Sequence, residues 1–553
     1  MNLRPIALVP FLLALAGCSA SPPSPEAIRA AGEVITPDSL ESHMRFLADD
    51  ALMGRETASP GYAVAADYVA AHFQELGLEP AGTGGTWFQE VPFMKTKLDE
   101  SKSSLTMTAG GRTRKLPYGD VYTISPDLLR DEVRADAGVV FVGFGVTAPD
   151  FEYDDYAGVD ARGKIVLLLR GAPPTMPHNE RAYYAWTRIK KQNAVAHGAI
   201  GIVLIRTPEN ERQFPWAKML SHSHGADMRW VDPQGHPSFE PEELKAGAVL
   251  NDAGAALLFK GAPTPLDSVF ARSLRGKPGS FPLDARLDIV TVSERSRVTS
   301  RNVLARLPGT DPALREENVL VSAHLDHIGV SVPVNGDSIN NGAYDNASGI
   351  AATIETARAF TRLPRKPRRS ILFFATTGEE KGLQGADYFS ENPTVPIGSI
   401  VANVNLDMFL MLCPLEDVVA FGAEHSSLAA ITERAAGHHG FTVSPDPAPE
   451  EVVFIRSDQF PFVRKGIPAV FITSGTKCSD GADGDSLSKA WRAGPYHNIT
   501  DDMSQKMDFD SGVRFARTNF EIALDVANDD HRPTWNPGDF FGEKFAGTRH
   551  AQP

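Results

Sequence analysis

The chain has 553 residues, of which 42% are hydrophobic, and its formal net charge is −15. It is longer than one ordinary domain and apolar enough for sizeable cores, so we expect two globular units and exclude wholesale disorder. Because phosphate binding requires a basic face, the acidic balance argues against nucleic acid as a partner.

The first residues have the pattern of an export signal. Within residues 1–17, Arg4 is followed by a short apolar run, which ends in the sequence LAGC at Cys18. This ending resembles a bacterial lipobox, in which the cysteine is lipidated and becomes the mature N-terminus. An ordinary signal peptide with an incidental cysteine is the alternative. We favour the lipobox, which predicts a Gram-negative lipoprotein of the periplasm or outer membrane, held to the membrane only by the lipid on Cys18. Residues 18–36 are then a flexible Pro/Ser tether.

Two helices are predicted in residues 37–95, the first part of the main unit. Asp38 and Ser39 precede an apolar-periodic run and are typical of a helix start. A second amphipathic helix is expected from Tyr62 to Leu76, with Gly77 as its C-terminal cap.

Residues 96–299 have a different pattern, with apolar runs such as VVFVGFGV and KIVLLL bounded by Gly and Asp. No cluster of His, Cys or acidic residues in this part of the sequence has the spacing of metal ligands. We therefore expect an inserted β-rich unit with a role in access or recognition rather than in chemistry.

From residue 300 to 553 the pattern alternates between strand and helix. Near-continuous apolar runs are typical of strands covered on both faces, and helices are expected at Gly349–Phe360 and Leu428–His438. This predicts an α/β fold, a three-layer sandwich with a mostly parallel central sheet. The expected strands are residues 318–325, 370–378, 399–407 and 469–475.

Residue types that bind metals stand at the ends of these expected strands, where open α/β sheets hold their ligands. His324 and Asp326 are two apart on a strand and project to one side, so Asp326 is a candidate for the carboxylate that orients a metal-bound imidazole. A surface His–Asp pair is the alternative. Asp345 precedes a helix and could bridge two cations, cap that helix, or do both.

Glu379 and Glu380 follow an apolar strand, where two acids are costly unless a cation compensates them. Adjacent residues point differently, so one could bind metal while the other handles the proton of a water. A solvated pair of acids is the alternative. Asp407 ends another apolar strand, and His497 supplies a second imidazole. Two imidazoles and three carboxylates would complete two four-coordinate zinc ions with a labile position, as in catalytic sites.

The order of these motifs from Pro37 to about Asp510 resembles metallopeptidase family twenty-eight, which contains bacterial leucyl-type aminopeptidases, glutamate carboxypeptidase II and glutaminyl cyclases. The segment from GFGVTAPDF to KIVLLLRG resembles the protease-associated domain often inserted in these enzymes. Ser457-Asp458 resembles the family's Ser-Asp-His stretch, with Gln459 in place of the histidine. The resemblance implies Glu379 as general base, Asp326 as the carboxylate that orients His324, and as zinc ligands His324, Asp345 (bridging), Glu380, Asp407 and His497.

The function implied by this resemblance is a co-catalytic dizinc exopeptidase, with two Zn²⁺ per chain, that acts on peptide substrates. We favour an aminopeptidase. A glutamate carboxypeptidase-like or dipeptidase activity would need cations for a substrate carboxylate, for which Arg456, Lys465, Lys477 and Arg492 are candidates. A glutaminyl cyclase, which uses one zinc, and a metal-free receptor-like protein are weaker alternatives.

Besides Cys18, the sequence contains only Cys413 and Cys478. In an exported protein they could form a disulfide, since the compartment is oxidising. Two unpaired buried thiols are the alternative, and the sequence does not decide between the two.

Overall fold

The computed structural model describes residues 23–451, 453–545 and 547. The predicted export signal and Cys18 lie outside these residues. From Pro25 the chain is folded: Ser24 caps the helix α1 (Pro25–Gly32), and Ala31 and Ile35 are buried. The prediction of a tether over residues 18–36 is therefore wrong for its second half, because the apolar side chains of this segment pack on the core.

The two helices expected next are confirmed. Helix α2 (Pro37–Leu47) begins at the cap Thr36, whose side chain accepts a hydrogen bond from the Ser39 backbone N–H. Helix α3 (Pro60–Glu75) is followed by Gly77, which has a φ of +71°. Glycine adopts this left-handed conformation without steric cost, as expected just beyond a helix end.

The main unit contains the parallel sheet that was predicted. Its four central strands are parallel in the order β17–β14–β18–β21, and antiparallel neighbours flank them, β13 beside β17 and β19 beside β21. Strand β20 pairs in parallel with the outer side of β19. The bounds are β14 (Asn318–His324), β17 (Ser370–Thr376), β18 (Ile400–Leu406), β19 (Asp417–Phe421), β20 (Thr442–Ser444) and β21 (Ala469–Ser474).

Helices cover both faces of this sheet, which confirms the three-layer sandwich. On β14, Val319 and Val321 point to one apolar cluster, whereas Leu320 between them points to another on the opposite face. Because both faces of each strand are buried, the sequences of these strands are nearly continuous runs of apolar residues. The first cluster includes residues of α2, α3, α10 (Ser348–Arg362), α12 (Leu428–His438) and α15 (Phe509–Asn528); the second includes α11 (Gln384–Glu391) and α13 (Gln459–Val463).

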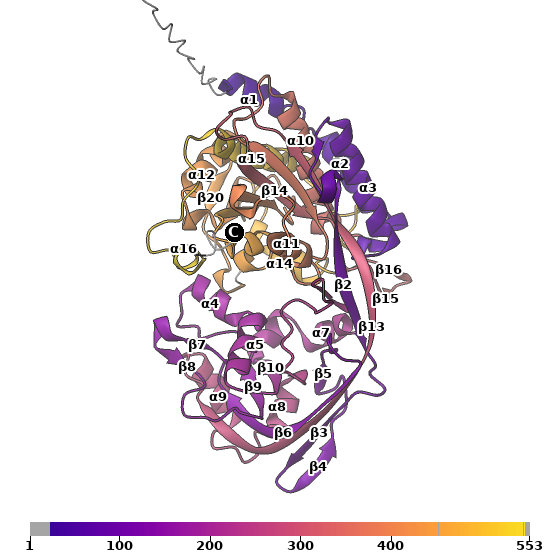
Figure 1. Ribbon diagram of the computed structural model, residues 1–553, viewed down its shortest axis with the longest axis vertical. Helices are drawn as coiled ribbons and strands as arrows, with labels where there is room; N and C mark the ends of the chain where they lie inside the picture. The colour runs from indigo at the N-terminus through magenta and orange to yellow at the C-terminus, as the bar shows by residue number, and fades with distance from the viewer. Residues whose placement is uncertain (1–22, 452, 546, 548–553) are drawn as a thin grey trace, which may run out of the picture.

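The inserted unit, in the lower half of Figure 1, has a sheet and an apolar core of its own. The sheet order is β4–β3–β13–β6–β9–β10–β12–β5. Its strands are β3 (Ser104–Ala109), β4 (Arg112–Lys115), β5 (Tyr122–Ile124), β6 (Glu132–Val142), β9 (Ile165–Leu169), β10 (Gly201–Ile205) and β12 (Gly247–Leu250). Its helices include α4 (His178–Ala185), α5 (Thr187–Ala196), α7 (Trp216–Ser223), α8 (Asp252–Leu258) and α9 (Leu266–Ser273).

Two long strands join the units without a linker. Strand β13 (Ser280–Leu307) belongs to both sheets, and β2 (Phe88–Leu98) pairs with it from Leu98 beside Ser293 to Phe88 beside Val303. Strand β11 (Asp227–Trp230) adds to the outer side of β2. The expected domain limits at residues 96 and 299 therefore fall inside a hydrogen-bonded ladder rather than in flexible connections.

Cys413 and Cys478 form a disulfide, with their Cα atoms 5.8 Å apart. The bond connects the segment after β18 to the segment after β21, so it resolves the question that the sequence left open. Within the described part of the chain, no helix is both long and apolar enough to cross a bilayer.

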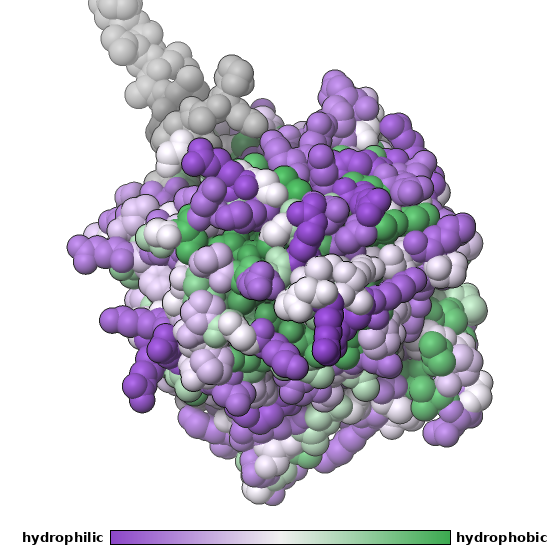
Figure 2. All heavy atoms as spheres, turned by 90° about the horizontal axis from the view of Figure 1, so that it is seen from below, coloured by the Kyte–Doolittle hydropathy of each residue, from purple (hydrophilic) through white to green (hydrophobic). Residues whose placement is uncertain are grey.

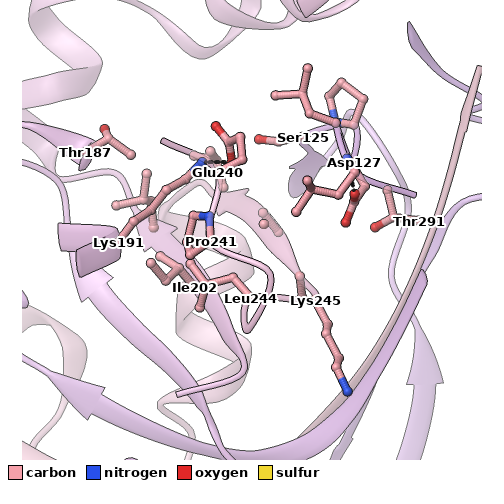
Figure 3. Close-up of a pocket in the computed structure, with 18 residues that line it drawn as sticks. Ser125, Asp127, Thr187, Lys191, Ile202, Glu240, Pro241, Leu244, Lys245 and Thr291 are labelled. Atoms are coloured by element: carbon pink, nitrogen blue, oxygen red, sulfur yellow. Dashed lines mark hydrogen bonds and ion pairs between the residues drawn. The ribbon is translucent and has the colours of Figure 1, made fainter. Parts of the chain in front are cut away.

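The exposed end of the inserted unit is mostly hydrophilic, with apolar residues in groups between polar side chains (Figure 2). A cavity of about 120 Å³ lies inside this unit, beside β10 and β12 (Figure 3). Its wall includes an ion pair of 2.6 Å between Lys191 Nζ and Glu240 Oε2. None of the residues that line it belongs to the predicted ligand set, so the cavity is separate from the site described next.

Candidate metal centre

Three neighbouring parallel strands deliver most of the predicted ligands. His324 is the last residue of β14, Asp407 directly follows β18, and Glu379 and Glu380 lie just beyond β17. Parallel strands end at one edge of a sheet, so these side chains meet although they are far apart in the sequence. Asp345 comes from the turn Ala343–Ala347 before α10.

Asp345 is the carboxylate that joins the two imidazoles. Its Oδ1 lies 3.2 Å from His324 Nε2, and its Oδ2 lies 3.2 Å from His497 Nε2. Asp345 is buried and His497 is partly exposed, so the centre is open to solvent on the His497 side. The structure thus brings together residues 324, 345 and 497 with one carboxylate between the imidazoles.

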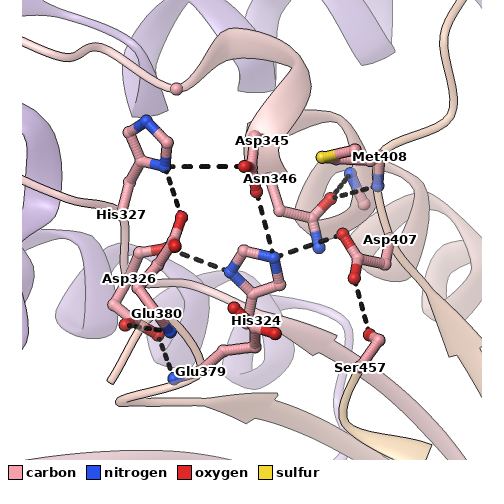
Figure 4. Close-up of polar contacts among 12 residues, drawn as sticks. His324, Asp326, His327, Asp345, Asn346, Glu379, Glu380, Asp407, Met408 and Ser457 are labelled. Carbon is pink, nitrogen blue, oxygen red and sulfur yellow. Dashed lines mark hydrogen bonds and ion pairs between the residues drawn. The ribbon is translucent and has the colours of Figure 1, made fainter. Parts of the chain in front are cut away.

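Each imidazole also faces a terminal carboxylate. His324 Nε2 is 3.2 Å from Asp407 Oδ1, and His497 Nε2 is 3.2 Å from Glu380 Oε2 (the first contact is drawn in Figure 4). Four-coordinate ions with ligand bonds of about 2.0 Å place neighbouring ligand atoms about 3.3 Å apart. The four separations fit that value, so this donor set is suited to two adjacent metal ions that share Asp345.

The ring of His324 is oriented by a backbone group. Its Nδ1 lies 3.0 Å from the carbonyl oxygen of Asp326. Because a carbonyl only accepts, Nδ1 carries the hydrogen and Nε2 keeps a free lone pair for a cation. The Asp326 carboxylate, predicted to do this, instead accepts the backbone N–H groups of Glu379 (3.1 Å) and Glu380 (3.3 Å). The expected contact is therefore wrong, and Asp326 positions the two glutamates.

Other buried polar groups hold Asp407. Ser457 Oγ donates to Asp407 Oδ2 at 2.5 Å, and Asn405 Nδ2 donates both to Ser457 Oγ (2.8 Å) and to Gln459 Oε1 (3.0 Å). Gln459 is fully buried and also donates to the Phe454 carbonyl. Gln459, the residue that departs from the family pattern, thus supports the segment that holds Asp407. Among the described residues it contacts no candidate ligand.

Asp345 does not cap the helix that follows it, a role that its sequence position also allowed alongside bridging. The Gly349 backbone N–H donates instead to Asn346 Oδ1 at 2.9 Å. Asp501, which is fully buried, accepts the backbone N–H groups of Tyr344 (2.9 Å) and Asp345 (3.1 Å). These bonds fix the turn, so the Asp345 side chain is free to face the imidazoles.

The centre brings several carboxyl groups together in surroundings that are shielded from water. Burial raises the pKa of Glu379 well above its usual range and raises that of Asp458 to about 7. Burial also favours the neutral form of Asp345, but its contacts with His324 and His497 hold its pKa well below the ordinary value. A buried charge needs a counter-charge, so the surplus of carboxylates favours bound cations.

Arg55 is a buried cation close to this cluster, yet within the described part of the chain it forms no ion pair with the carboxylates of the cluster. Arg55 is 1% exposed, and its guanidinium donates to the backbone carbonyls of Leu325 (3.0 Å), Asn341 (2.7 Å) and Gly342 (3.0 Å). It therefore ties the segment after α2 to the metal-facing turns and leaves the carboxylates for other partners.

The sequence reasoning missed His327. This histidine is fully buried, and its Nδ1 lies 2.8 Å from Glu380 Oε1 (Figure 4). With Asp345 and Glu380 it forms a second group whose ligand atoms lie within 4.8 Å of one another. Its position directly after Asp326, at the end of a predicted strand, was the available signal.

Residues 302–523 match the sequence model that defines peptidase family M28. This segment of the chain is therefore similar to the proteins of peptidase family M28. The match agrees with the family that the order of the motifs indicated, and all five predicted zinc ligands lie inside the matched segment. Most of the inserted unit lies outside the matched residues, so its assignment as a protease-associated domain stays a prediction.

Curated relatives match short parts of the chain. A probable zinc metalloprotease of Pyrenophora teres f. teres (strain 0-1) is 34% identical over 111 residues, which are 20% of this chain and 23% of that protein. Leupeptin-inactivating enzyme 1 of Streptomyces exfoliatus is 34% identical over 114 residues, again 20% of this chain and 23% of that protein. The chain thus spans about a quarter of the length of the curated relatives it matches.

A solved structure resembles the chain over nearly its whole length. The aminopeptidase from Aneurinibacillus sp. strain AM-1 superposes with a TM-score of 0.53 at 19% identity, over 93% of this chain and 99% of that one. At this identity the similarity shows a common fold, in agreement with the sandwich and parallel sheet described above.

Proposed function

We propose that this chain is a zinc exopeptidase of the aminopeptidase type, which uses two Zn²⁺ per chain and removes N-terminal residues from peptides. The observation that carries the proposal is the single carboxylate of Asp345, with one oxygen 3.2 Å from each of two imidazoles. The match of residues 302–523 to peptidase family M28 supports it, as do the names of the similar proteins, a probable zinc metalloprotease and an aminopeptidase.

In this proposal His324, Asp407 and Asp345 would hold one zinc, and His497, Glu380 and Asp345 would hold the other. When bound, the ions would polarise the scissile carbonyl and lower the pKa of the attacking water. These residues supply nitrogen and oxygen ligands of the kind that zinc binds, and no sulfur ligand, as is common in catalytic sites.

Glu379 is the residue proposed to move the proton. Its side chain points toward His324, and Asp326 holds its backbone N–H (Figure 4). It is not among the proposed ligands. Burial raises its pKa well above the usual range. Such a carboxylate is a stronger base, so Glu379 can accept a proton from the attacking water and return it to the leaving amine.

The surplus negative charge around the centre also bears on which end of a peptide it receives. Beyond the ligands, the fully buried carboxyl groups of Asp326 and Asp458 and the half-buried one of Glu379 lie at the same edge of the sheet. An ammonium group is attracted to such a field, whereas a carboxylate is repelled. This favours a substrate that approaches with its N-terminus.

The decisive experiment is a panel of aminoacyl-nitroanilides, each with a free and with an acetylated N-terminus, assayed with zinc restored after chelation. We expect hydrolysis of the free forms only, together with close to two zinc ions per chain by elemental analysis. Hydrolysis of the blocked forms would contradict the aminopeptidase assignment. One zinc per chain, with cyclisation of N-terminal glutamine, would favour the cyclase alternative.

One observation favours a dipeptidase-like preference as a second candidate. The Tyr496 ring stacks on His497 with ring centres 4.0 Å apart, and Arg456 lies within electrostatic reach of both Tyr496 and Arg170. Arg456 and Arg170 are both exposed, one from each unit. Dipeptides with free and with amidated C-termini test this: Arg456→Gln should raise KM for the free acids only.

We also propose that the chain is an exported lipoprotein attached through Cys18. The support is the sequence pattern of residues 1–18, which lie outside the described structure. In cells, Cys18→Ser should move the protein from the membrane fraction to the soluble fraction while its peptidase activity is retained. Membrane attachment of Cys18→Ser equal to that of the unchanged chain would contradict the proposal.

A further inference from the structure

His327 lies against the candidate centre without belonging to either set of predicted ligands. Its side chain is fully buried, and its Nδ1 is 2.8 Å from Glu380 Oε1 and 4.0 Å from Asp345 Oδ2. Its Nε2 has no hydrogen-bond partner among the described residues. The short contact is a hydrogen bond to a carboxylate, so Nδ1 is the donor.

The two oxygens of Glu380 consequently have different partners. Oε1 accepts from His327, whereas Oε2 lies 3.2 Å from His497 Nε2, the separation expected between two ligands of one ion. A carboxylate that gives one oxygen to an N–H donor offers only the other to a metal. Glu380 is thereby restricted to a single-oxygen contact.

The geometry disfavours His327 itself as the ligand. Neighbouring ligand atoms of a tetrahedral zinc are about 3.3 Å apart, whereas His327 Nδ1 is 4.0 Å from Asp345 Oδ2 and only 2.8 Å from Glu380 Oε1. The His497 nitrogen, at 3.2 Å from an oxygen of each of the two acids, fits both separations. Distance alone thus separates a ligand from a supporting residue.

The surrounding backbone holds the His327 ring in place. The His327 N–H donates to the Arg55 carbonyl at 3.2 Å, which attaches it to the segment after α2. Gly342, with a φ of +62°, lies so close that a Cβ there would be 2.7 Å from His327 Cγ and Cδ2. The ring therefore has little room to turn away from Glu380.

We propose that His327 is a positioning residue that holds Glu380 in single-oxygen coordination and so sets the zinc affinity of the site that contains His497. Partners of this kind fix the orientation of a ligand, and their loss typically weakens metal binding by about 10- to 100-fold. The inference rests on the proposed function only in that it requires two zinc ions to bind; it makes no use of peptide hydrolysis.

The test compares zinc affinities of the full chain in two variants, measured by competition with a chromophoric chelator. His327→Leu removes the donor, and we expect one of the two sites to bind zinc about 10- to 100-fold more weakly while the other is unchanged. In His327→Asn the amide nitrogen can occupy the place of Nδ1, so we expect affinity to return to within a few fold of the unchanged chain. The melting temperature of the zinc-free proteins monitors folding.

His425 offers a matched control. It is 3% exposed, its Nδ1 lies 2.5 Å from Asp539 Oδ2, and its Nε2 has no hydrogen-bond partner but lies 3.5 Å from Glu424 Oε1, and among the described residues these contacts do not involve the candidate centre. His425→Leu should leave both zinc affinities unchanged. If His327→Leu fails to fold, His327→Gln replaces it, because the longer glutamine places its amide away from the Nδ1 position and should bind zinc more weakly than His327→Asn.

Several results would overturn the inference. They are unchanged affinity at both sites in His327→Leu, equal weakening of both sites, or failure of His327→Asn to restore binding. If His497→Ala kept two zinc ions and His327→Leu kept one, His327 would be the ligand. An unchanged chain that binds two zinc ions but hydrolyses no peptide would refute the proposed function and leave this inference standing.

Discussion

Glu379 and Glu380 are neighbours in the sequence, yet their surroundings differ. Asp326 accepts the backbone N–H of each, which fixes the turn between them. The Glu380 carboxylate is then divided between His327 and His497, whereas no other side chain donates a hydrogen bond to that of Glu379 among the described residues. A carboxylate without a fixed partner is available to exchange a proton.

We therefore expect Glu379→Gln to reduce kcat by about 10²- to 10⁴-fold, the usual contribution of a general base, with zinc content unchanged. The measurement is kcat on the preferred nitroanilide together with elemental analysis of zinc. Glu433→Gln, at an exposed position on α12, is the control and should behave as the unchanged chain. Near-native kcat in Glu379→Gln would show that another group moves the proton.

We expect Lys190, which lies away from the metal centre, to make the free energy of unfolding depend on pH. It is 2% exposed in the inserted unit, and burial lowers its pKa to about 7. The unfolded chain keeps an ordinary lysine pKa near 10.4, so between pH 7 and pH 10 the unfolded state binds more protons. Stability therefore rises with pH in this window, by about 2 kcal/mol between pH 7 and pH 9.

Urea unfolding at pH 7 and pH 9 measures this effect. Lys190→Met lacks the titrating group, so the difference in free energy of unfolding between the two pH values should be about 2 kcal/mol smaller than in the unchanged chain. Lys260→Met, at an exposed position of the same unit, should retain the full pH dependence. Equal pH dependence in Lys190→Met and the unchanged chain would contradict the assignment.

At the scale of elements, the order β17–β14–β18 explains why the ligands meet. Each strand ends at the same edge, and the segments after them carry the acids. The segments beyond β18 and β21 are further held by the bond between Cys413 and Cys478, which closes a loop of 65 residues. Closing a loop of this length restricts the unfolded chain.

The double variant Cys413→Ala with Cys478→Ala should therefore lose about 4 kcal/mol of unfolding free energy, the value expected for a loop of this length. Chemical denaturation of the oxidised and reduced forms measures it, and reduction of the unchanged chain should produce the same loss as the variant. A loss below about 1 kcal/mol would mean that native contacts of these segments suffice without the bond.

At the scale of the whole molecule, the two units share strands. Strand β13 crosses from one sheet to the other, and β2 pairs along it. Trp230 of β11 adds a contact, because its Nε1 donates to Asp387 Oδ2 of α11 at 2.8 Å. Partial unfolding of either unit would break the ladder that supports the other. The units are thus expected to unfold together.

Calorimetry should show one thermal transition for the unchanged chain. Trp230→Ala should lower the free energy of unfolding by about 3–5 kcal/mol, the usual cost of removing a buried tryptophan, and still unfold in one transition because the shared strands remain. Leu274→Ala, at a side chain that is 74% exposed, is the control. Two well-separated transitions in the unchanged chain would show that the units are independent.

The sequence by itself determined the features that depend on local pattern. Four central strands could be predicted from the sequence, because both of their faces are buried and their apolar runs are continuous: β14, β17, β18 and β21. The helices α3 and α12 could be predicted from the helical periodicity of their apolar residues. The candidate ligands were found because acids and histidines stood where such strands end, and the family resemblance added their proposed roles.

Only the tertiary structure decided the features that depend on contacts between distant segments. The bond from His327 to Glu380, the two backbone amides held by the Asp326 carboxylate, and the pairing of Cys413 with Cys478 each join residues more than fifty positions apart. The periodicity of a sequence does not show which distant backbone group a side chain will contact. The same holds for α1, which packs on the core where composition indicated a tether, and for β13, which runs through the predicted domain limit at residue 299.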